Sequence, residues 1–182
     1  MSQTILYIAS SLDGFIAKPD GNLDWLTSTP NPDSGDYGYE ELLNRIGTLY
    51  MGRKTYEAIL GFGIEWPYAA YKTYVISTQN NLSIQTPNTE LLSEHWEERV
   101  RKINESTTKD SWLVGGGHLI NAFLREELID KMIITIIPQL IGEGIPLFSG
   151  KTPTSAWRLI ESKAFNTGVV NLSYEKERKR LM

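Results

Sequence analysis

The chain contains no cysteine and only two histidines, and its basic residues do not outnumber its acidic ones. Without cysteine it can form no disulfide, thiolate metal site or cysteine nucleophile. His95 and His118 lie far apart in the sequence and have no acidic ligand at helical spacing, so no metal site is expected. The 18 Lys and Arg against 22 Asp and Glu give a formal charge of −4, which argues against a nucleic-acid-binding protein.

Long apolar runs are also missing. No stretch approaches the roughly 20 apolar residues of a membrane helix, and the first four residues lack the basic start of a signal peptide. We therefore expect a cytoplasmic protein with no membrane partner. The 182 residues, of which 41% are apolar and 22% charged, are enough to bury a hydrophobic core. We expect a single domain over residues 1–182.

Short apolar segments of strand length alternate with segments of helical period. The strand-like segments are rich in β-branched or aromatic residues, as expected for strands buried on both faces, and they cover residues 5–9, 48–51, 73–76, 112–114 and 132–137. The helical stripes are Tyr39, Leu42, Leu43 and Ile46; then Leu92, Trp96, Val100 and Ile103 after a Ser93 N-cap; and finally Leu119, Ile120, Phe123 and Leu124.

The pattern changes near the C-terminus. Residues 157–165 and 169–175 flank a turn at residues 166–168, and alternate residues of the second segment are apolar. This period of two predicts a hairpin. Alternating strands and helices followed by a hairpin predict an α/β fold, with a mostly parallel sheet that ends in antiparallel edge strands.

In an open α/β sheet, ligands bind outside the carboxyl ends of the strands. After the second predicted strand comes Gly52-Arg53-Lys54-Thr55, which opens a helix. The free N–H groups of a helix start, with a guanidinium beside them, predict a site for an anion such as phosphate. The alternative is a basic surface turn, because Arg and Lys are normally exposed.

A second glycine-containing turn, Gly115-Gly116-Gly117, also follows a strand and begins a helix. Such a turn can present backbone N–H groups to a pyrophosphate, although it is neither a P-loop nor G-x-G-x-x-G. The alternative is simply a tight strand-to-helix turn. Ser77-Thr78, after another strand, could bind a further phosphate. Together these sites at the strand ends predict that the protein binds a dinucleotide. A 2′-phosphate would sit well beside Arg53 and Ser77, which favours NADP over NAD.

Taken in order, these motifs resemble those of dihydrofolate reductases. Residues 137–148, and Ser11-Leu12-Asp13-Gly14, look more like the reductase domain of the bifunctional riboflavin-biosynthesis deaminase-reductase. The resemblance covers nearly the whole chain. It implies a dihydrofolate reductase-like three-layer fold, with helices on both faces of a mostly parallel central sheet and a C-terminal antiparallel hairpin. The motifs are Ala9, Asp13-Gly14-Phe15-Ile16-Ala17, Leu23-Asp24-Trp25, Met51-Gly52-Arg53-Lys54-Thr55-Tyr56-Glu57, Val75-Ile76-Ser77-Thr78, Val114-Gly115-Gly116-Gly117 and Ile133-Ile134-Thr135.

The resemblance also implies roles for single residues around bound NADPH. Trp25 and Thr135 would face the substrate, and Gly115-Gly116 would be joined by a cis peptide bond. The nicotinamide pocket would contain Ala9, Ile16 and Ala17; the phosphates would be held by Gly52, Arg53, Lys54, Thr55, Ser77 and Thr78; and the pyrophosphate would be held by Gly115, Gly116, Gly117, His118 and Leu119.

Aspartates are the best candidates for supplying a proton during reduction. Asp13, Asp24 and Asp36 are the candidates, and a partly buried carboxylate would have its pKa raised into a useful range. Dihydrofolate reductases place a carboxylate on the helix that precedes the strand with the Met-Gly-Arg motif. The nearest match in this chain is Asp36. The alternatives are a helix N-cap for Asp36 and a turn residue for Asp13. Val114 stands where the riboflavin-pathway domain has an acidic residue, which weighs against a sugar-phosphate substrate.

We therefore predict an NADPH-dependent reductase of a small heterocycle. The substrate would be dihydrofolate-like, or like 5-amino-6-(5-phosphoribosylamino)uracil in riboflavin biosynthesis. One alternative is an NADP(H)-binding module without efficient turnover, and another is a plain structural or partner-binding domain. The resemblance to riboflavin-pathway reductase domains further implies pairing as a homodimer.

Overall fold

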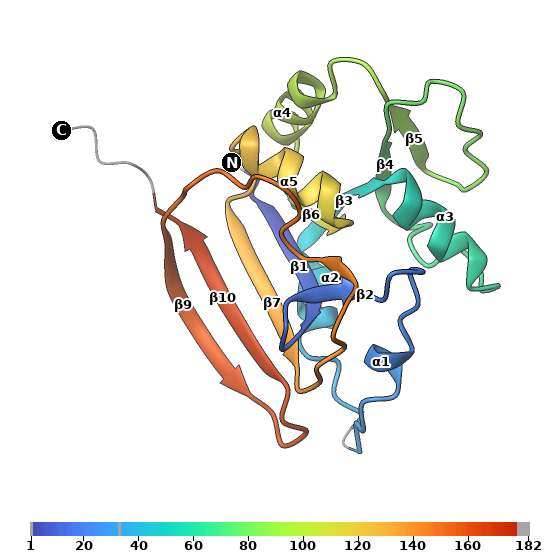
Figure 1. The fold of residues 1–182 in the computed structure, drawn as a ribbon. Helices are drawn as coiled ribbons and strands as arrows, with labels where there is room; N and C mark the ends of the chain where they lie inside the picture. The colour runs from blue at the N-terminus through green and yellow to red at the C-terminus, as the bar shows by residue number, and fades with distance from the viewer. Residues whose placement is uncertain (1, 33, 178–182) are drawn as a thin grey trace.

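The structure, a computed structural model, describes residues 2–32 and 34–177. Within them lies an eight-stranded sheet in the order β5-β4-β3-β6-β1-β7-β10-β9 (Figure 1). Its pairs from β5 to β7 are parallel, and β10 pairs antiparallel with both β7 and β9, as predicted. A smaller sheet joins β2 and β8. The strands are β1 (Thr4–Ser11), β2 (Phe15–Ala17), β3 (Ile46–Gly52), β4 (Lys72–Ile76), β5 (Thr89–Leu92), β6 (Asp110–Gly115), β7 (Lys131–Ile137), β8 (Ile145–Pro146), β9 (Trp157–Ala164) and β10 (Val170–Lys176).

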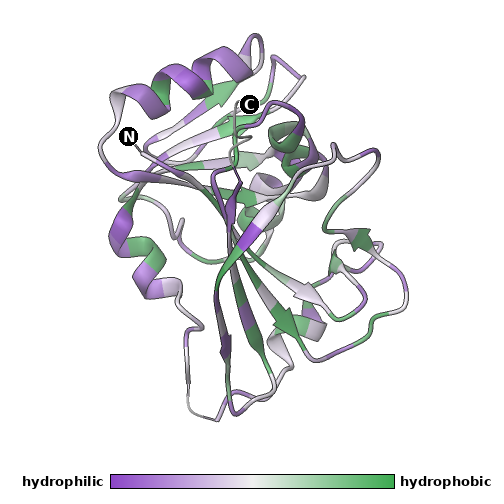
Figure 2. Cartoon of the chain, turned by 90° about the vertical axis from the view of Figure 1, so that its left-hand side faces the viewer, coloured by the Kyte–Doolittle hydropathy of each residue, from purple (hydrophilic) through white to green (hydrophobic). Residues whose placement is uncertain are grey.

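Helices cover both faces of the main sheet. They are α1 (Asp24–Thr27), α2 (Tyr39–Arg45), α3 (Arg53–Gly61), α4 (Trp96–Ser106) and α5 (Gly117–Arg125). Side chains of β1 alternate between two cores, because Leu6 packs with residues of α4 and α5 whereas Ile5 packs with residues of α2 and α3. The predicted three layers are therefore confirmed. Figure 2 shows hydrophobic segments along the strands of the sheet and hydrophilic segments on the helices outside it.

Two helix boundaries differ from the prediction. Leu92 does not begin a helix but ends β5, where it pairs with Ile76 and is fully buried. The following helix starts at Trp96, and its N-cap is His95 rather than Ser93. Ile46 likewise begins β3 instead of closing the helix before it. Apolar spacing alone misassigned both residues, because a residue buried at the junction of two elements fits either pattern.

The C-terminal hairpin is confirmed. β9 and β10 pair in antiparallel register, with an irregularity between Ser173 and Tyr174. The turn is closed by backbone hydrogen bonds from Phe165 N to Val169 O and from Gly168 N to Phe165 O, each 2.9 Å long. Gly168 has a φ of 83°, a conformation that favours glycine. In the part of the chain described, no helix has the length and apolar character needed to cross a membrane.

Candidate active site

The carboxyl ends of the central parallel strands meet at one edge of the sheet, where the strand register brings the two glycine-containing turns together. Met51 pairs with Gly115, and Gly52 pairs with Ile76. A Cβ built on Gly52 would lie 3.7 Å from the Gly115 carbonyl oxygen and 3.9 Å from the Gly116 nitrogen. The two turns, 60 or so residues apart in sequence, are therefore in direct contact.

Both turns lead into a helix start that has no side-chain cap. Gly52 is the N-cap of α3 and Gly116 is the N-cap of α5, and both have extended backbone conformations. The first N–H groups of the two helices are thus left without a capping acceptor. The implied cis peptide bond joins Gly115 and Gly116. Two adjacent helix starts of this kind have the chemistry to hold the two phosphates of a dinucleotide.

Arg53 is the first residue of α3 and lies beside this pair of helix starts. Its guanidinium Nη1 donates to both carboxylate oxygens of Glu57, at 2.8 and 2.9 Å. Its side chain is 32% exposed and that of Glu57 is 45% exposed. Exposed ion pairs of this spacing are worth about 0.3–0.5 kcal/mol. Such a weak pair leaves Arg53 able to exchange Glu57 for a phosphate.

The remaining residues predicted to bind phosphate differ in the contacts and the burial of their side chains. A Cβ built on Gly116 would lie 3.5 Å from Thr55 Oγ1, so this hydroxyl lies against the α5 turn. Ser77 follows the end of β4, and its Oγ accepts a hydrogen bond from Gln79 N at 3.0 Å. Leu119 is buried in the core formed with α4. The side chains exposed to solvent are those of Lys54, Thr78 and His118.

The small sheet of β2 and β8 positions the predicted nicotinamide residues. Ile16 packs against the core that contains α5, and Ala17 is buried in β2 opposite Ile145. A Cβ built on Gly144 would overlap the Ala17 carbonyl oxygen. Glycine at residue 144 is therefore required for β8 to approach β2 closely enough to pair with it.

Asp13 joins two loops at this edge of the sheet. Its carboxylate accepts hydrogen bonds from Ser11 Oγ at 2.6 Å and from Gly142 N at 2.7 Å, with further bonds from Ile141 N. The hydrogen bond from Ser11, followed by those from the two backbone N–H groups, lowers the pKa of this exposed carboxyl. Asp13 is thus held ionised, in the turn position that the sequence left open as its alternative.

Asp36 and Asp24 are also exposed. Asp36 accepts hydrogen bonds from Glu40 N at 2.6 Å and from Gly38 N at 3.1 Å, which lower the pKa of its carboxyl. The N-cap of α2 is Gly38, so Asp36 is not the N-cap itself but stabilises the helix start from two residues before it. Asp24 begins α1 and accepts from Asn22 Nδ2 at 2.8 Å. The expectation of a partly buried aspartate with a raised pKa is therefore wrong for Asp13 and Asp36. The Ser11 hydroxyl and backbone N–H groups stabilise the charged form of Asp13, and backbone N–H groups stabilise that of Asp36.

Replacing Asp13 by alanine is expected to lower the stability of the fold at neutral pH by loosening the link between the loops. Since the pKa of the folded carboxyl is below its ordinary 3.8, its contribution is complete above that pH and is lost as the pH falls through the lower, folded value. Urea unfolding at pH 7 and pH 3 measures this. The difference between wild type and Asp13→Ala should shrink at pH 3.

Glu143→Ala is the matched control for Asp13→Ala. Glu143 is exposed in the same loop, and no side-chain hydrogen bond is found for it among the residues that the structure covers. It should leave stability unchanged at both pH values. An equal loss in the two variants, or a loss in Asp13→Ala that persists at pH 3, would contradict the ionic link.

The predicted substrate-side residues contain buried polar atoms without partners. Thr135 on β7 is 4% exposed and pairs with Ala9 on β1. Trp25 is also 4% exposed and packs in a cluster with Ala9 and Tyr37. For residues 2–32 and 34–177, neither Thr135 Oγ1 nor Trp25 Nε1 has a hydrogen-bond partner. Buried polar atoms of this kind can serve a bound molecule.

Three further residues of this region were missed by the sequence analysis. Asn171 Nδ2 and Tyr7 Oη both donate to the Tyr37 carbonyl oxygen, at 2.5 and 3.3 Å. Burial raises the pKa of Tyr7 to about 12, so the phenol stays protonated. Tyr7 could have been found, since alternation puts it on the same face of β1 as Ala9. The register of β10 with β7, which places Asn171 opposite Thr135, has no local signal.

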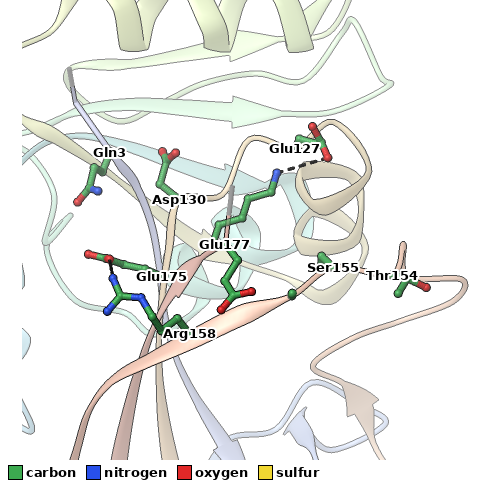
Figure 3. Close-up of a pocket in the computed structure, with 10 residues that line it drawn as sticks. Gln3, Glu127, Asp130, Thr154, Ser155, Arg158, Glu175 and Glu177 are labelled. Atoms are coloured by element: carbon green, nitrogen blue, oxygen red, sulfur yellow. Dashed lines mark hydrogen bonds and ion pairs between the residues drawn. The ribbon is translucent and has the colours of Figure 1, made fainter. Parts of the chain in front are cut away.

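A further cavity lies elsewhere, at the opposite edge of the sheet. It has a volume of about 1190 Å³, and its lining includes Gln3 before β1, Asp130 before β7 and Glu177 after β10. Figure 3 shows the ion pairs Arg158–Glu175 and Lys176–Glu127 at this cavity. Since ligands of open α/β sheets bind at the carboxyl ends of the strands, this cavity is not the candidate active site.

A mostly parallel α/β sheet with two glycine-containing helix starts at its carboxyl edge, closed by an antiparallel hairpin, defines a dihydrofolate reductase-like fold. The structure of dihydrofolate reductase from Enterococcus faecalis, 16% identical, matches it with a TM-score of 0.69 over 97% of each chain. The chain belongs to the RibD C-terminal domain family, whose pattern matches residues 3–171.

Two nearer relatives support this assignment. A protein from Shewanella sp. PV-4, described as a candidate riboflavin biosynthesis protein, is 34% identical, and its crystal structure matches with a TM-score of 0.85 over 97% of this chain and 99% of that one. The uncharacterized protein YwjB of Bacillus subtilis (strain 168) is 36% identical over 167 residues, 92% of this chain and 94% of the relative. The family and its structural neighbours point to a reductase-type oxidoreductase.

Proposed function

We propose that this protein is an NADPH-dependent reductase that transfers a hydride to a pterin or aminopyrimidine-type substrate, dihydrofolate-like or 5-amino-6-(5-phosphoribosylamino)uracil-like. The observation that carries the proposal is the contact between two uncapped helix starts, at Gly52 and Gly116, beside Arg53. The dihydrofolate reductase of Enterococcus faecalis, which shares the fold, was solved in complex with NADP(H). NADPH supplies the hydride when bound.

Different residues of the chain would bind the cofactor and the substrate. The N–H groups after Gly52 and Gly116 would hold the phosphates, and the Arg53 guanidinium would hold the 2′-phosphate. Ala9 lies beside Thr135 in the sheet, so a nicotinamide at Ala9 would adjoin the buried polar atoms of Thr135 and Trp25. A substrate ring bound beside these atoms would be oriented by hydrogen bonds and shielded from water.

The second candidate function is an NADP(H)-binding module without efficient turnover. It is favoured by the three aspartates, all exposed, two of which have a lowered pKa. Such carboxylates are poor proton donors near neutral pH. In an active reductase the proton would then come from solvent.

Two measurements separate these functions. NADPH and NADH are titrated while tryptophan fluorescence is followed, and NADPH is expected to bind at least tenfold more tightly because of Arg53. NADPH oxidation is then followed with dihydrofolate and with 5-amino-6-(5-phosphoribosylamino)uracil. Absence of quenching at millimolar cofactor would sink both functions, whereas tight binding without oxidation by either substrate would favour the module without turnover.

The edge strand β9 supports the further proposal of a homodimer. It exposes Leu159 and Ile160, which are 50% and 42% accessible. It pairs with β10 on one side, and within the described chain no strand pairs with its other side. Long edge strands with exposed apolar residues are suited to pairing with a second chain.

A further inference from the structure

We infer that Asn171 is a specificity-determining residue that accepts a hydrogen bond from a ring N–H of a lactam-type heterocycle. The inference rests on the proposed function and adds a residue to its substrate side. Asn171 lies on β10 and pairs with Thr135 on β7, which in turn pairs with Ala9 on β1. Directly paired residues project from the same face of a sheet. The three side chains therefore form a row that runs from the expected nicotinamide position toward Asn171.

The orientation of the Asn171 amide is fixed by its contact with Tyr37. The partner atom is a backbone carbonyl oxygen, which can only accept, so the amide atom 2.5 Å away must be the donor Nδ2. The same carbonyl also accepts from Tyr7 Oη at 3.3 Å. With Nδ2 held in this way, Oδ1 is directed elsewhere. Oδ1 is buried and has no hydrogen-bond partner in the described structure.

Other unpartnered polar atoms of the predicted substrate side indicate which kind of ligand could bind beside Asn171 Oδ1. Thr135 Oγ1 can donate or accept, and Trp25 Nε1 can only donate. Asn171 Oδ1 can only accept, and it carries no charge. Asn171, Thr135 and Trp25 thus present an acceptor, a hydroxyl and a donor without an ionised group. Together they suit a ring that carries both N–H and C=O groups.

The location fits a recess that opens to solvent. Tyr7, Tyr37, Phe165 and Asn171 line one small cavity between α2 and the β9–β10 hairpin. Its lining also includes the charged side chains of Glu41, Arg45, Lys131, Glu161 and Lys163. A Cβ built on Gly38 would lie 3.9 Å from Asn171 Nδ2, so the turn before α2 packs directly on this amide. The amide is therefore held between sheet and turn, which limits its freedom to rotate away from a ligand.

A pair of probes tests the inference. The probes are 5,6-diaminouracil and its 1,3-dimethyl derivative, in which both ring N–H groups are replaced by N-methyl. Binding is measured in the presence of NADPH for wild type and for Asn171→Ala. Wild type is expected to prefer the unmethylated probe by tenfold or more, and Asn171→Ala to lose about tenfold of that preference because the acceptor is gone. The Kd for NADPH should change by less than twofold.

Ser173→Ala is the matched control, since Ser173 lies two residues further on the same face of β10 and lines the same cavity. It should keep the preference. If Asn171→Ala fails to fold, Asn171→Gln, which retains the amide one carbon further out, should show a reduced preference. An unchanged preference in a folded Asn171 variant, or no binding of the unmethylated probe by wild type that binds NADPH, overturns the inference. Failure of wild type to bind NADPH instead overturns the proposed function.

Discussion

Replacing Arg53 by alanine is expected to weaken NADPH binding about 30- to 100-fold while NADH binding changes by less than twofold. Hydrogen bonds to charged groups contribute about 1.5–3 kcal/mol, and a guanidinium can contact the 2′-phosphate through two N–H groups at once. Only NADPH carries that phosphate. Fluorescence titration with both dinucleotides gives the ratio of the two dissociation constants, which isolates the 2′-phosphate contribution from any general effect on the site.

Two neighbouring variants sharpen this test. Glu57→Gln removes the ion pair of 2.8 Å that competes for Arg53, and we expect it to tighten NADPH binding about twofold, in line with the small worth of an exposed pair. Lys54→Ala changes an exposed cation in the same helix start and should weaken both dinucleotides modestly. If Arg53→Ala weakened NADPH and NADH equally, its guanidinium would instead serve the pyrophosphate that they share.

Gly144→Ala is expected to destabilise the protein by about 1–3 kcal/mol, the usual range for forcing extra volume into a packed site. The added Cβ would overlap the Ala17 carbonyl oxygen, and this backbone atom cannot move without separating β8 from β2. Because Ile16 and Ala17 lie on β2, the dissociation constant of NADPH should rise as well. Chemical unfolding and cofactor titration of the same preparation measure both effects.

Gly61→Ala provides the comparison for Gly144→Ala. Gly61 ends α3, and a Cβ there would meet no heavy atom within 4 Å. Its backbone is not in the left-handed region, so alanine should leave stability within about 0.5 kcal/mol of wild type or raise it slightly. Equal stability of the two variants would show that β8 can shift, and that the close approach of β2 and β8 is not required.

The success of the strand predictions follows from the physics of parallel sheets. Central strands are buried on both faces, so segments such as residues 48–51 read as continuous apolar runs whatever surrounds them. The failures lie where burial depends on a distant neighbour. Leu92 is buried because it pairs with Ile76, and β5 escaped detection because only its last residue is fully buried.

In the candidate site, too, features with a local sequence signal could be predicted and features that depend on tertiary contacts could not. The positions of the two glycine-containing turns, with Arg53 at one of them, could be predicted, because small residues directly after a buried strand indicate a turn into the next helix. The behaviour of Asp36 could not be settled in advance, because helix cap and proton donor use the same residue type. In the structure Gly38 is the N-cap of α2, and Asp36 accepts hydrogen bonds from two backbone N–H groups at the helix start, which lower the pKa of its carboxyl instead of raising it.

The sequence by itself determined the central parallel strands, the C-terminal hairpin and the positions of the two glycine-containing turns, because each depends on residues close together in the chain. Only the tertiary structure decided which strands are neighbours and which polar groups are buried. Tyr37 and Asn171 are 134 residues apart and meet through a single hydrogen bond. Their contact, which leaves Asn171 Oδ1 buried and without a partner in the described structure, arises from the register of β10 with β7, which is set by packing over the whole sheet.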